Sequence, residues 1–441
     1  MKALLVIILC LLLLPGLCCA GELSALDIAN RNARFFADGV GVDADTGIPF
    51  DTIFVDKTTR AIKQDRYVNT TEIGEYLSIL VLCERGIITI PNMSPQQALR
   101  RINSLLNCLW DAPNWKGLFY WPYNISADGA LVPGEGGKVV PAVDNGNLSF
   151  ALAGVAGAYL NDKSFSKSVI CEKVELLLAR QIPGWQALFD PKRQLLRAGW
   201  NPVNNADLGY YIDRKANESR LSVIWAIIAT KDSSAPVPLA AMENMPLFTG
   251  EYTLANGKKL TAELTWDGTI FQALLPAIYI NESKYISDYS LISNFVAAQA
   301  DFANRHGLPA LLSASSTIDD GYASFGLKEL SESYVKFGNA APPDDCGTPH
   351  ASALAYLVNP KLSLQLLNDL YRKYPQIETP YGWYDAINAK GETGSKLLSL
   401  DQGMLVLALS GNDTANWVEN YLNSKQLLPT LQAIYKSYRP Q

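Results

Sequence analysis

Apolar residues recur at helical spacing through most of the chain, which predicts a protein built mainly from helices. One helix start is well defined, because Asn69 and Glu72 have the spacing of a capping box and Ile73, Leu77 and Leu80 share a face behind them. The same periodicity predicts about a dozen helices in all. Apart from the helix that follows Asn69, they lie near residues 24–38, 95–110, 147–160, 164–180, 217–231, 268–280, 288–305, 349–357, 361–373, 402–410 and 413–422.

Long segments without helical periodicity separate these helices. One of them contains Asn256-Gly257 between alternating residues, which predicts a β-hairpin with a two-residue turn. Strands and helices do not alternate along the chain, so a Rossmann or TIM-barrel architecture is disfavoured. The pattern predicts a closed toroid of paired helices with the loops gathered at one mouth, although a solenoid of helical repeats stays open. The loops span residues 39–67, 114–146, 184–216, 233–264, 306–348 and 375–400.

The first 20 residues have the features of a secretory signal. Lys2 supplies positive charge, Leu4 to Leu14 is an apolar run too short to span a bilayer comfortably, and Ala20 ends a stretch of small residues suited to cleavage. Cys18 and Cys19 leave a lipoprotein signal as the alternative. We therefore expect an exported protein with no membrane span, in which residues 1–20 are the signal and 21–441 form one domain.

The remaining composition excludes several classes of function. A net charge of −6 gives no basic footprint for nucleic acid. His306 and His350 are the only histidines, which argues against histidine-based catalysis, and no metal or cofactor is expected. Four cysteines remain after the signal, and their wide spacing favours buried thiols or one disulfide over a zinc site. They are Cys83, Cys108, Cys171 and Cys346.

Acidic residues recur where a loop rich in aromatic, Gly or Asn residues gives way to a predicted helix. Each could simply cap its helix, and this is the simplest reading of Asp267 in Trp-Asp-Gly-Thr. Taken together, and with 9 Trp and 21 Tyr in the chain, they favour a polar cleft that binds sugar rings. Glu218 stands out because a partly buried glutamate can have a raised pKa and act as a general acid. The set is Asp144, Glu218, Asp267, Asp385 and Asp401, with Asp345 before Cys346 as a further placed acid.

Several short motifs, in this order, resemble the glycoamylase-like domain family, whose relatives include endo-β-1,2-glucanases and a domain of cyclic β-1,2-glucan synthases. The resemblance covers nearly all of the chain after residue 20. The motifs are Thr71-Glu-Ile-Gly-Glu-Tyr-Leu77, Gly117-Leu-Phe-Tyr-Trp121, Val143-Asp-Asn-Gly146, Asn217-Glu-Ser-Arg-Leu221, Trp266-Asp-Gly-Thr-Ile-Phe271 with Leu275-Pro276, Leu312-Ser-Ala-Ser315, Asp345-Cys-Gly-Thr348, Tyr381-Gly-Trp-Tyr-Asp-Ala386 and Asp401-Gln-Gly403.

The resemblance implies an all-α (α/α)6 toroid, with small β-hairpins and long loops at one face, that hydrolyses glycosidic bonds with inversion. It implies Glu218 as general acid and Asp401 as base, with Asp144 and Asp385 as competitors for the base. The residues expected to bind the carbohydrate substrate are Trp266, Asp267, Arg220, Asn145, Tyr384, Gln402 and Asp345.

The chain departs from the family pattern at two motifs. Ala310-Leu-Leu-Ser-Ala-Ser-Ser316 lacks an aromatic-Gly pair and an acid, and Asp345-Cys-Gly-Thr348 contains an inserted residue. These departures weaken the transfer of β-1,2-glucan specificity. We therefore predict a monomeric, exported glycoside hydrolase acting on an oligosaccharide or polysaccharide. A non-catalytic glycan-binding or polysaccharide-assembly protein on the same scaffold is the alternative, and a lyase is a third and weaker one.

Overall fold

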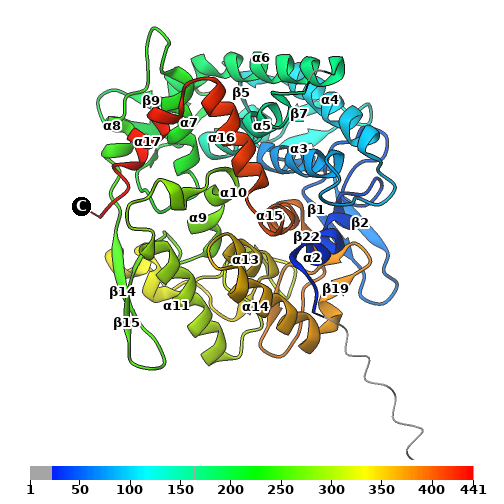
Figure 1. Ribbon diagram of the computed structural model, residues 1–441, viewed down its shortest axis with the longest axis vertical. Helices are drawn as coiled ribbons and strands as arrows, with labels where there is room; N and C mark the ends of the chain where they lie inside the picture. The colour runs from blue at the N-terminus through cyan, green and yellow to red at the C-terminus, as the bar shows by residue number, and fades with distance from the viewer. Residues whose placement is uncertain (1–21, 163, 441) are drawn as a thin grey trace, which may run out of the picture.

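The computed structural model describes residues 22–162 and 164–440, so the predicted signal lies outside the described residues. Helices dominate these residues, as the periodicity predicts (Figure 1). They are α2 Ala25–Asn32, α3 Thr70–Glu84, α4 Pro95–Asp111, α5 Ala142–Tyr159, α6 Phe165–Leu188, α7 Arg220–Thr230, α8 Ala240–Glu243, α9 Ile270–Leu274, α10 Pro276–Tyr279, α11 Ser290–His306, α12 Glu332–Phe337, α13 Pro349–Leu354, α14 Pro360–Lys373, α15 Ser399–Leu409, α16 Asp413–Ser424 and α17 Leu428–Tyr435.

The helices fall into two kinds, according to how much of their surface is buried. In α3 every residue from Thr70 to Cys83 is buried, and α5, α7 and α15 are almost as completely enclosed. In α4 and α14, by contrast, only one stripe is buried and the other faces are polar. A helix that is buried all round must be surrounded by other elements, so α3, α5, α7 and α15 form the inner part of the molecule.

Inner helices pack against one another and against outer helices. Helix α5 contacts α3, α7, α6 and α16, while α15 contacts α3, α13, α10 and α2. In Figure 1, α15 lies near the middle of the molecule, with α3, α10 and α13 around it. The contact between α15 and α3 joins segments from opposite ends of the chain. Buried apolar side chains from α2 to α17 form one continuous core.

One sequence prediction about the helices is confirmed in detail and two are corrected. The capping box at α3 is present, since Asn69 Oδ1 accepts from the Glu72 amide and Glu72 Oε2 accepts from the Asn69 amide. The predicted helix 268–280 is two short helices, because Pro276 has no N–H and begins the second one. Asp385, expected at a helix start, lies between the strands β20 and β21.

The strands are short and form sheets of two or three members in the connections between helices. They are β1 Thr52–Val55, β2 Ile62–Asp65, β3 Tyr67–Val68, β4 Asn114–Trp115, β5 Leu118–Phe119, β6 Tyr123–Ile125, β7 Leu131–Pro133, β8 Val140–Pro141, β9 Phe189–Asp190, β10 Leu195–Arg197, β11 Gly199–Asn201, β12 Ala206–Asp207, β13 Tyr211–Ile212, β14 Thr249–Thr253, β15 Lys259–Glu263, β16 Ala314–Ser316, β17 Tyr322–Ser324, β18 Cys346–Gly347, β19 Glu378–Thr379, β20 Gly382–Trp383, β21 Ile387–Asn388 and β22 Lys396–Leu398. In one three-stranded sheet β1 pairs with β2 and with β22, all antiparallel, which again joins the two ends of the chain.

The predicted hairpin at Asn256-Gly257 is confirmed, although its turn is longer than expected. Strands β14 and β15 pair antiparallel from Thr249 with Glu263 to Thr253 with Lys259, so residues 254–258 form the connection. Gly257 has a φ of 83°, a conformation that glycine adopts without steric cost.

The four cysteines after the predicted signal are free thiols, so the disulfide alternative is not realised. Cys83 and Cys346 are buried, and Cys108 and Cys171 are half-buried. Among the described residues no helix is long and apolar enough to cross a membrane.

Candidate active site

The predicted acids lie at or beside the N-terminal ends of inner helices. Asp144 is in the first turn of α5, Asp401 is in the first turn of α15, and Glu218 comes two residues before α7. The helix macrodipole there favours negative charge, so the fold partly offsets the cost of placing carboxylates in its interior.

Glu218 is half-buried, and one of its carboxyl oxygens has no hydrogen-bond partner. The pKa of Glu218 is raised to about 7, mainly by burial and further by the negative charges of Asp267 and Asp144, while Arg220 opposes the rise. The unpartnered oxygen is Oε2. A carboxyl group that keeps its proton near neutral pH and has a free oxygen can donate that proton to a substrate.

Glu218 lines a cavity of about 390 Å³. Tyr210, Tyr211, Arg214 and Trp266 line the same cavity, so aromatic rings and a guanidinium group surround the carboxyl group. Tyr210 is exposed at this site. Cavities of this size that combine apolar walls with a few polar groups are typical of ligand sites.

Asp144 is held in place by a defined hydrogen-bond chain. Asn147 Nδ2 donates to Thr71 Oγ1 at 3.1 Å, and Thr71 donates in turn to Asp144 Oδ1 at 2.8 Å. Because Thr71 Oγ1 already accepts from Asn147, its own proton is directed to Asp144. Burial raises the pKa of Asp144 to about 6 despite this hydrogen bond.

Asp385 and Asp401 form a second acidic pair. Asp385 is 2 % exposed and accepts from the Leu398 amide at 2.6 Å and from Gln402 Nε2 at 3.0 Å. Burial first, and then the charge of Asp401, raise the pKa of Asp385 well above its ordinary value.

Asp401 is held in place from β16 and α13. Ser315 Oγ donates to Asp401 Oδ2 at 2.6 Å, and His350 Nδ1 lies 3.2 Å from the same oxygen. His350 is 1 % exposed, and so is fixed by packing. Both groups can stabilise an ionised carboxylate, which is the form that a general base requires.

Tyr322 on β17 is exposed. The pKa of its hydroxyl is raised by desolvation first and then by the charges of Asp401 and Glu218, with smaller effects from Asp51 and Asp267. Both acids thus act electrostatically on the same hydroxyl group.

Arg220 and Asn145, both expected to bind substrate, lie in the core instead. Arg220 is fully buried, and its Nε and Nη2 donate to the two carboxylate oxygens of Glu282 at 2.9 and 2.7 Å. Asn145 is also fully buried and exchanges hydrogen bonds with both backbone groups of Phe119. Their proximity in sequence to Glu218 and Asp144 therefore reflects structural support for the site.

Trp266 lines the cavity, but its ring is already in contact with protein. The guanidinium carbon of Arg214 lies 4.2 Å from the centre of the Trp266 ring, and Phe337 packs at a centroid distance of 5.6 Å. Arg214 is fixed in turn by an ion pair to the buried Glu332 at 3.2 Å. Arg214 therefore covers a face of the Trp266 ring that a substrate could otherwise contact.

Asp267 does not cap the helix that follows it. The N-cap of α9 is Thr269, whose hydroxyl accepts from the Gln272 amide. Gln272 instead holds Asp267, since Nε2 donates to Asp267 Oδ2 at 3.2 Å. Burial raises the pKa of Asp267.

Three further residues expected to bind substrate lie apart from the cavity that Glu218 lines. Tyr384 is 2 % exposed and accepts from Arg60 Nη1 at 3.3 Å, and Gln402 is equally buried and supports Asp385. Asp345 is exposed and lines a separate hollow of about 330 Å³ with Asp319. Of the seven predicted substrate-binding residues, only Trp266 lines the cavity beside Glu218.

The sequence reasoning missed several residues of the site. Arg214 and Tyr322 come from loops without periodicity, where nothing in the sequence marks the contacts they make. Ser315 ends a motif that carries the family resemblance, and His350 was used only to argue against histidine catalysis. Glu75 is the residue that the sequence marks most clearly as a buried acid, because it lies within a helix whose other residues are mainly apolar.

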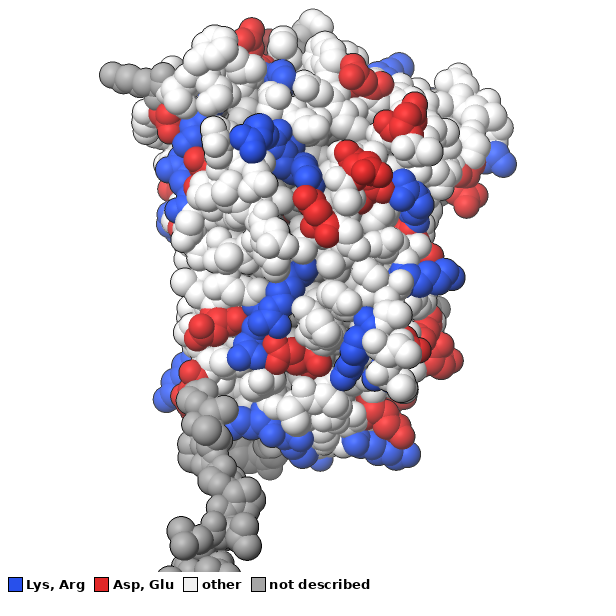
Figure 2. Space-filling model, turned by 90° about the vertical axis from the view of Figure 1, so that its right-hand side faces the viewer, with Lys and Arg blue, Asp and Glu red and all other residues white. Residues whose placement is uncertain are grey.

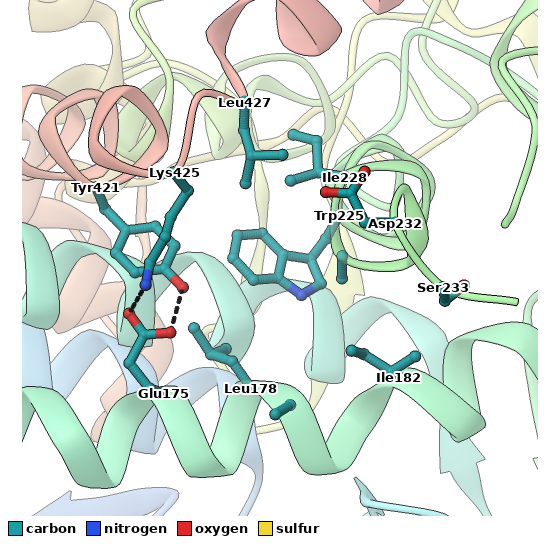
Figure 3. Close-up of a pocket in the computed structure, with 12 residues that line it drawn as sticks. Glu175, Leu178, Ile182, Trp225, Ile228, Asp232, Ser233, Tyr421, Lys425 and Leu427 are labelled. Atoms are coloured by element: carbon teal, nitrogen blue, oxygen red, sulfur yellow. Dashed lines mark hydrogen bonds and ion pairs between the residues drawn. The ribbon is translucent and has the colours of Figure 1, made fainter.

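A second cavity of about 350 Å³ lies between α6, α7 and the connection from α16 to α17 (Figure 3). Two carboxyl groups line it: Glu175, which is paired with Lys425 at 2.6 Å, and Asp232, which is exposed. Trp225 and Ile228 line it too, so it lies toward the end of α7 that is remote from Glu218. One of these carboxyl groups is paired with a lysine and the other faces solvent, whereas burial raises the pKa of Glu218 to about 7, so the cavity beside Glu218 is the better candidate active site.

The described residues contain no metal cluster, and the face of the molecule in Figure 2 has no basic patch. No group of three or more His, Cys, Asp or Glu residues among residues 22–162 and 164–440 could hold a metal ion. Figure 2 shows Lys and Arg interspersed with Asp and Glu on the face it presents. That face has no continuous basic patch that would attract nucleic acid.

Comparisons with known proteins agree on the fold. Residues 210–424 match a family model, named Glycoamylase, that is described as "Putative glucoamylase". No curated protein sequence matches the chain.

The solved structures match nearly the whole chain at low sequence identity. Endo-β-1,2-glucanase from Talaromyces funiculosus, bound to sophorose, has a TM-score of 0.80 and 15% identity over 93% of this chain and 89% of its own. Endo-β-1,2-glucanase from Chitinophaga pinensis has a TM-score of 0.70 and 17% identity over 94% of this chain and 98% of its own. A protein from Bacteroides caccae, described in the same words as the family model, has a TM-score of 0.73 and 17% identity over 93% and 98%. The chain thus resembles the glycoamylase-like family, in sequence over residues 210–424 and in fold over nearly its whole length.

Proposed function

We propose that the protein is a metal-independent glycoside hydrolase that cleaves a β-linked glucan. The observation that carries the proposal is Glu218: a carboxyl group with a pKa of about 7 and an unpartnered oxygen, on the wall of a cavity lined by aromatic residues. Glycoside hydrolysis requires one protonated and one ionised carboxyl group on either side of the bond that breaks. The substrate class is inferred from the endo-β-1,2-glucanases whose fold the chain shares.

Glu218 is the proposed general acid and Asp401 the proposed base. In an inverting reaction Glu218 would protonate the leaving oxygen while Asp401 removes a proton from the attacking water. Asp385 is a weaker candidate for the base, because burial raises its pKa and so favours its protonated form. Asp144, whose pKa is raised to about 6, is instead proposed to raise the pKa of Glu218 by its charge.

The proposed scaffold is one (α/α)6 toroid formed by residues 21–441. The inner helices α3, α5, α7, α13 and α15, together with the α9–α10 pair, supply six inner positions, and contacts join α3 to both α5 and α15. The carboxylates then lie at the mouth of the toroid, where these helices begin. We further propose export of a monomer, on the sequence of residues 1–20.

The test is to incubate the protein with a panel of β-linked glucans that includes β-1,2-glucan, and to measure the release of reducing ends. We expect release from at least one member and an inverted anomer in the first product, as seen by proton NMR. Glu218→Gln and Asp401→Asn should each lower kcat by about 10²-fold to 10⁴-fold. Glu251→Gln, on the exposed hairpin β14–β15, is the matched control and should keep the wild-type rate.

Binding of a glucan without turnover would instead support a non-catalytic glycan-binding protein on the same scaffold. Such a protein would also retain binding in Glu218→Gln and Asp401→Asn. Full activity in Glu218→Gln would show that the general acid is another residue.

A further inference from the structure

Glu75 is a buried acid that the proposed reaction does not use. It lies on α3, is 0 % exposed, and neither of its carboxyl oxygens has a hydrogen-bond partner among the described residues. Buried polar groups almost always have partners, because leaving them unpaired costs free energy. An acid kept in this position therefore requires an explanation.

The chain makes room for this carboxyl group on the neighbouring helix. A Cβ atom added at Gly403 of α15 would lie 2.1 Å from Glu75 Oε2, so only glycine fits there without a shift. Gly403 is two residues after Asp401, and α3 packs against α15. The charge of Asp401 acts on Glu75 directly enough to raise its pKa, after burial as the main cause. The Glu75 carboxyl group thus lies at the α3–α15 contact, against Gly403 and two residues along α15 from Asp401.

The groups around Glu75 and Asp401 indicate whether the Glu75 carboxyl group is charged or neutral. Asp385 faces Asp401 from the β20–β21 connection, His350 from α13 and Tyr322 from β17, while Tyr279 on α10 and Glu72 on α3 face Glu75. None of these groups is a lysine or arginine, and the Tyr279 hydroxyl makes no hydrogen bond to Glu75. A carboxylate buried without a cation or a hydrogen bond is very costly, so Glu75 is the neutral acid and its O–H needs an acceptor.

We propose that neutral Glu75 is a positioning residue that donates its proton toward Asp401 through one bridging water molecule, and thereby keeps Asp401 ionised. This inference rests on the proposed function, in which Asp401 is the base. It assigns a role to an acid on α3 that does not touch substrate. It also explains why α15 has a glycine where a larger residue would push Glu75 away.

The experiment compares two substitutions of similar size. Glu75→Gln keeps a donor at this position, whereas Glu75→Leu removes it. We expect Glu75→Gln to keep kcat/KM within about threefold of wild type. Glu75→Leu should lower kcat/KM at pH 5 by about tenfold, with KM unchanged, because the acidic limb of the pH profile moves up by about one pH unit. Glu263→Gln, another buried glutamate with a pKa raised to about 7, is the control and should not move that limb.

A second measurement does not depend on catalysis. In protein carrying carboxyl-¹³C aspartate, the Asp401 signal is identified by its loss in Asp401→Asn, and its titration is followed by NMR. Glu75→Leu should raise the pKa of Asp401, and Glu75→Gln should leave it near the wild-type value. An unchanged titration in Glu75→Leu would overturn the proposal. A lowered pKa in Glu75→Gln would do the same, because it would mean that Glu75 is charged.

The two readouts separate this inference from the proposed function. If no glucan is cleaved by the wild-type protein, the proposed function fails, while the NMR titration still decides whether Glu75 donates toward Asp401. If glucan is cleaved but neither readout responds to Glu75→Leu, only the role of Glu75 is wrong. If Glu75→Leu does not fold, the titration of Glu75→Gln still decides the matter.

Discussion

Glu218 and Arg220 stand two residues apart and have opposite environments. The guanidinium group of Arg220 is fully buried, but it donates hydrogen bonds to Glu282 and to the backbone carbonyls of Gln272 and Ala273. Glu218 lines the cavity, and its Oε2 has no hydrogen-bond partner among the described residues. Burying the Glu218 carboxyl group without a full set of partners therefore costs stability, whereas the buried charge of Arg220 is compensated. Local costs of this kind are common at functional sites.

The pH dependence of stability should report this difference. Because the pKa of Glu218 in the folded protein, about 7, exceeds its ordinary value of 4.5, its contribution to stability is fully present below pH 4.5 and is lost as the pH rises through 7. We expect Glu218→Gln to be more stable than wild type at pH 8, by about 2 kcal/mol, and equal to it at pH 4. Urea unfolding at both pH values measures this. Equal stability at pH 8 would show that Glu218 ionises there without cost.

The sequence identifies the unusual acids more reliably than it identifies the residues that surround them. Asp144 and Asp401 follow loops and begin helices, and that pattern is visible in the sequence. The partners Thr71 and Ser315 come from segments 73 and 86 residues away, so periodicity could not identify them. The misplaced substrate contacts, Arg220 and Asn145, have the same cause, because a polar residue beside an acid can face the core as easily as the cavity.

Among the elements, α5 is the helix on which the inner packing most depends. It contacts α3, α6, α7 and α16, and two of its glycines face α16. A Cβ atom at Gly157 would lie 1.8 Å from the Trp417 carbonyl oxygen, whereas one at Gly154 would lie 3.5 Å from Val418. Of these two glycines, Gly157 is therefore the one at which the backbones of the two helices approach most closely.

This difference predicts opposite effects for the same substitution. Gly157→Ala should destabilise the protein by about 1–3 kcal/mol, because α5 and α16 must separate to admit the methyl group. Gly154→Ala should be neutral, or stabilising by up to about 1 kcal/mol, because alanine favours the helix and meets only an ordinary contact. Midpoints of urea unfolding compare the two variants. A Gly157→Ala variant as stable as Gly154→Ala would contradict the close approach.

Long helices were predicted from the sequence far better than short ones. α4, α11 and α14 show clear stripes of buried residues, and their predicted ranges agree closely with the structure. α8, α12 and α17 were missed, because four to eight residues are too few to show a period. The loops that shape the cavity were predicted to exist, but not the strands within them.

At the scale of the whole molecule, the two ends of the chain are built into each other. Strand β1 pairs with β22, Leu23 exchanges hydrogen bonds with Asn368, and Asn32 Oδ1 accepts from the Trp383 amide at 2.8 Å. These links join residues more than 300 positions apart, and Trp383 is two residues before Asp385. The acidic pair on this side of the site therefore depends on contacts that form only when the chain closes on itself.

Asn32→Leu tests this closure. It keeps side-chain volume but leaves the buried Trp383 amide without an acceptor, which should cost about 1–3 kcal/mol of unfolding free energy. Asn30→Leu on the same helix is the matched control, because Asn30 accepts only from the exposed Thr89 amide and its loss should cost less. If residues 22–440 fold as one unit, far-UV circular dichroism and tryptophan fluorescence will report the same shifted midpoint for Asn32→Leu, since no part can unfold alone. Two separate transitions would instead mean that the ends of the chain open independently of the rest, and the proposal of a single closed toroid would then fail.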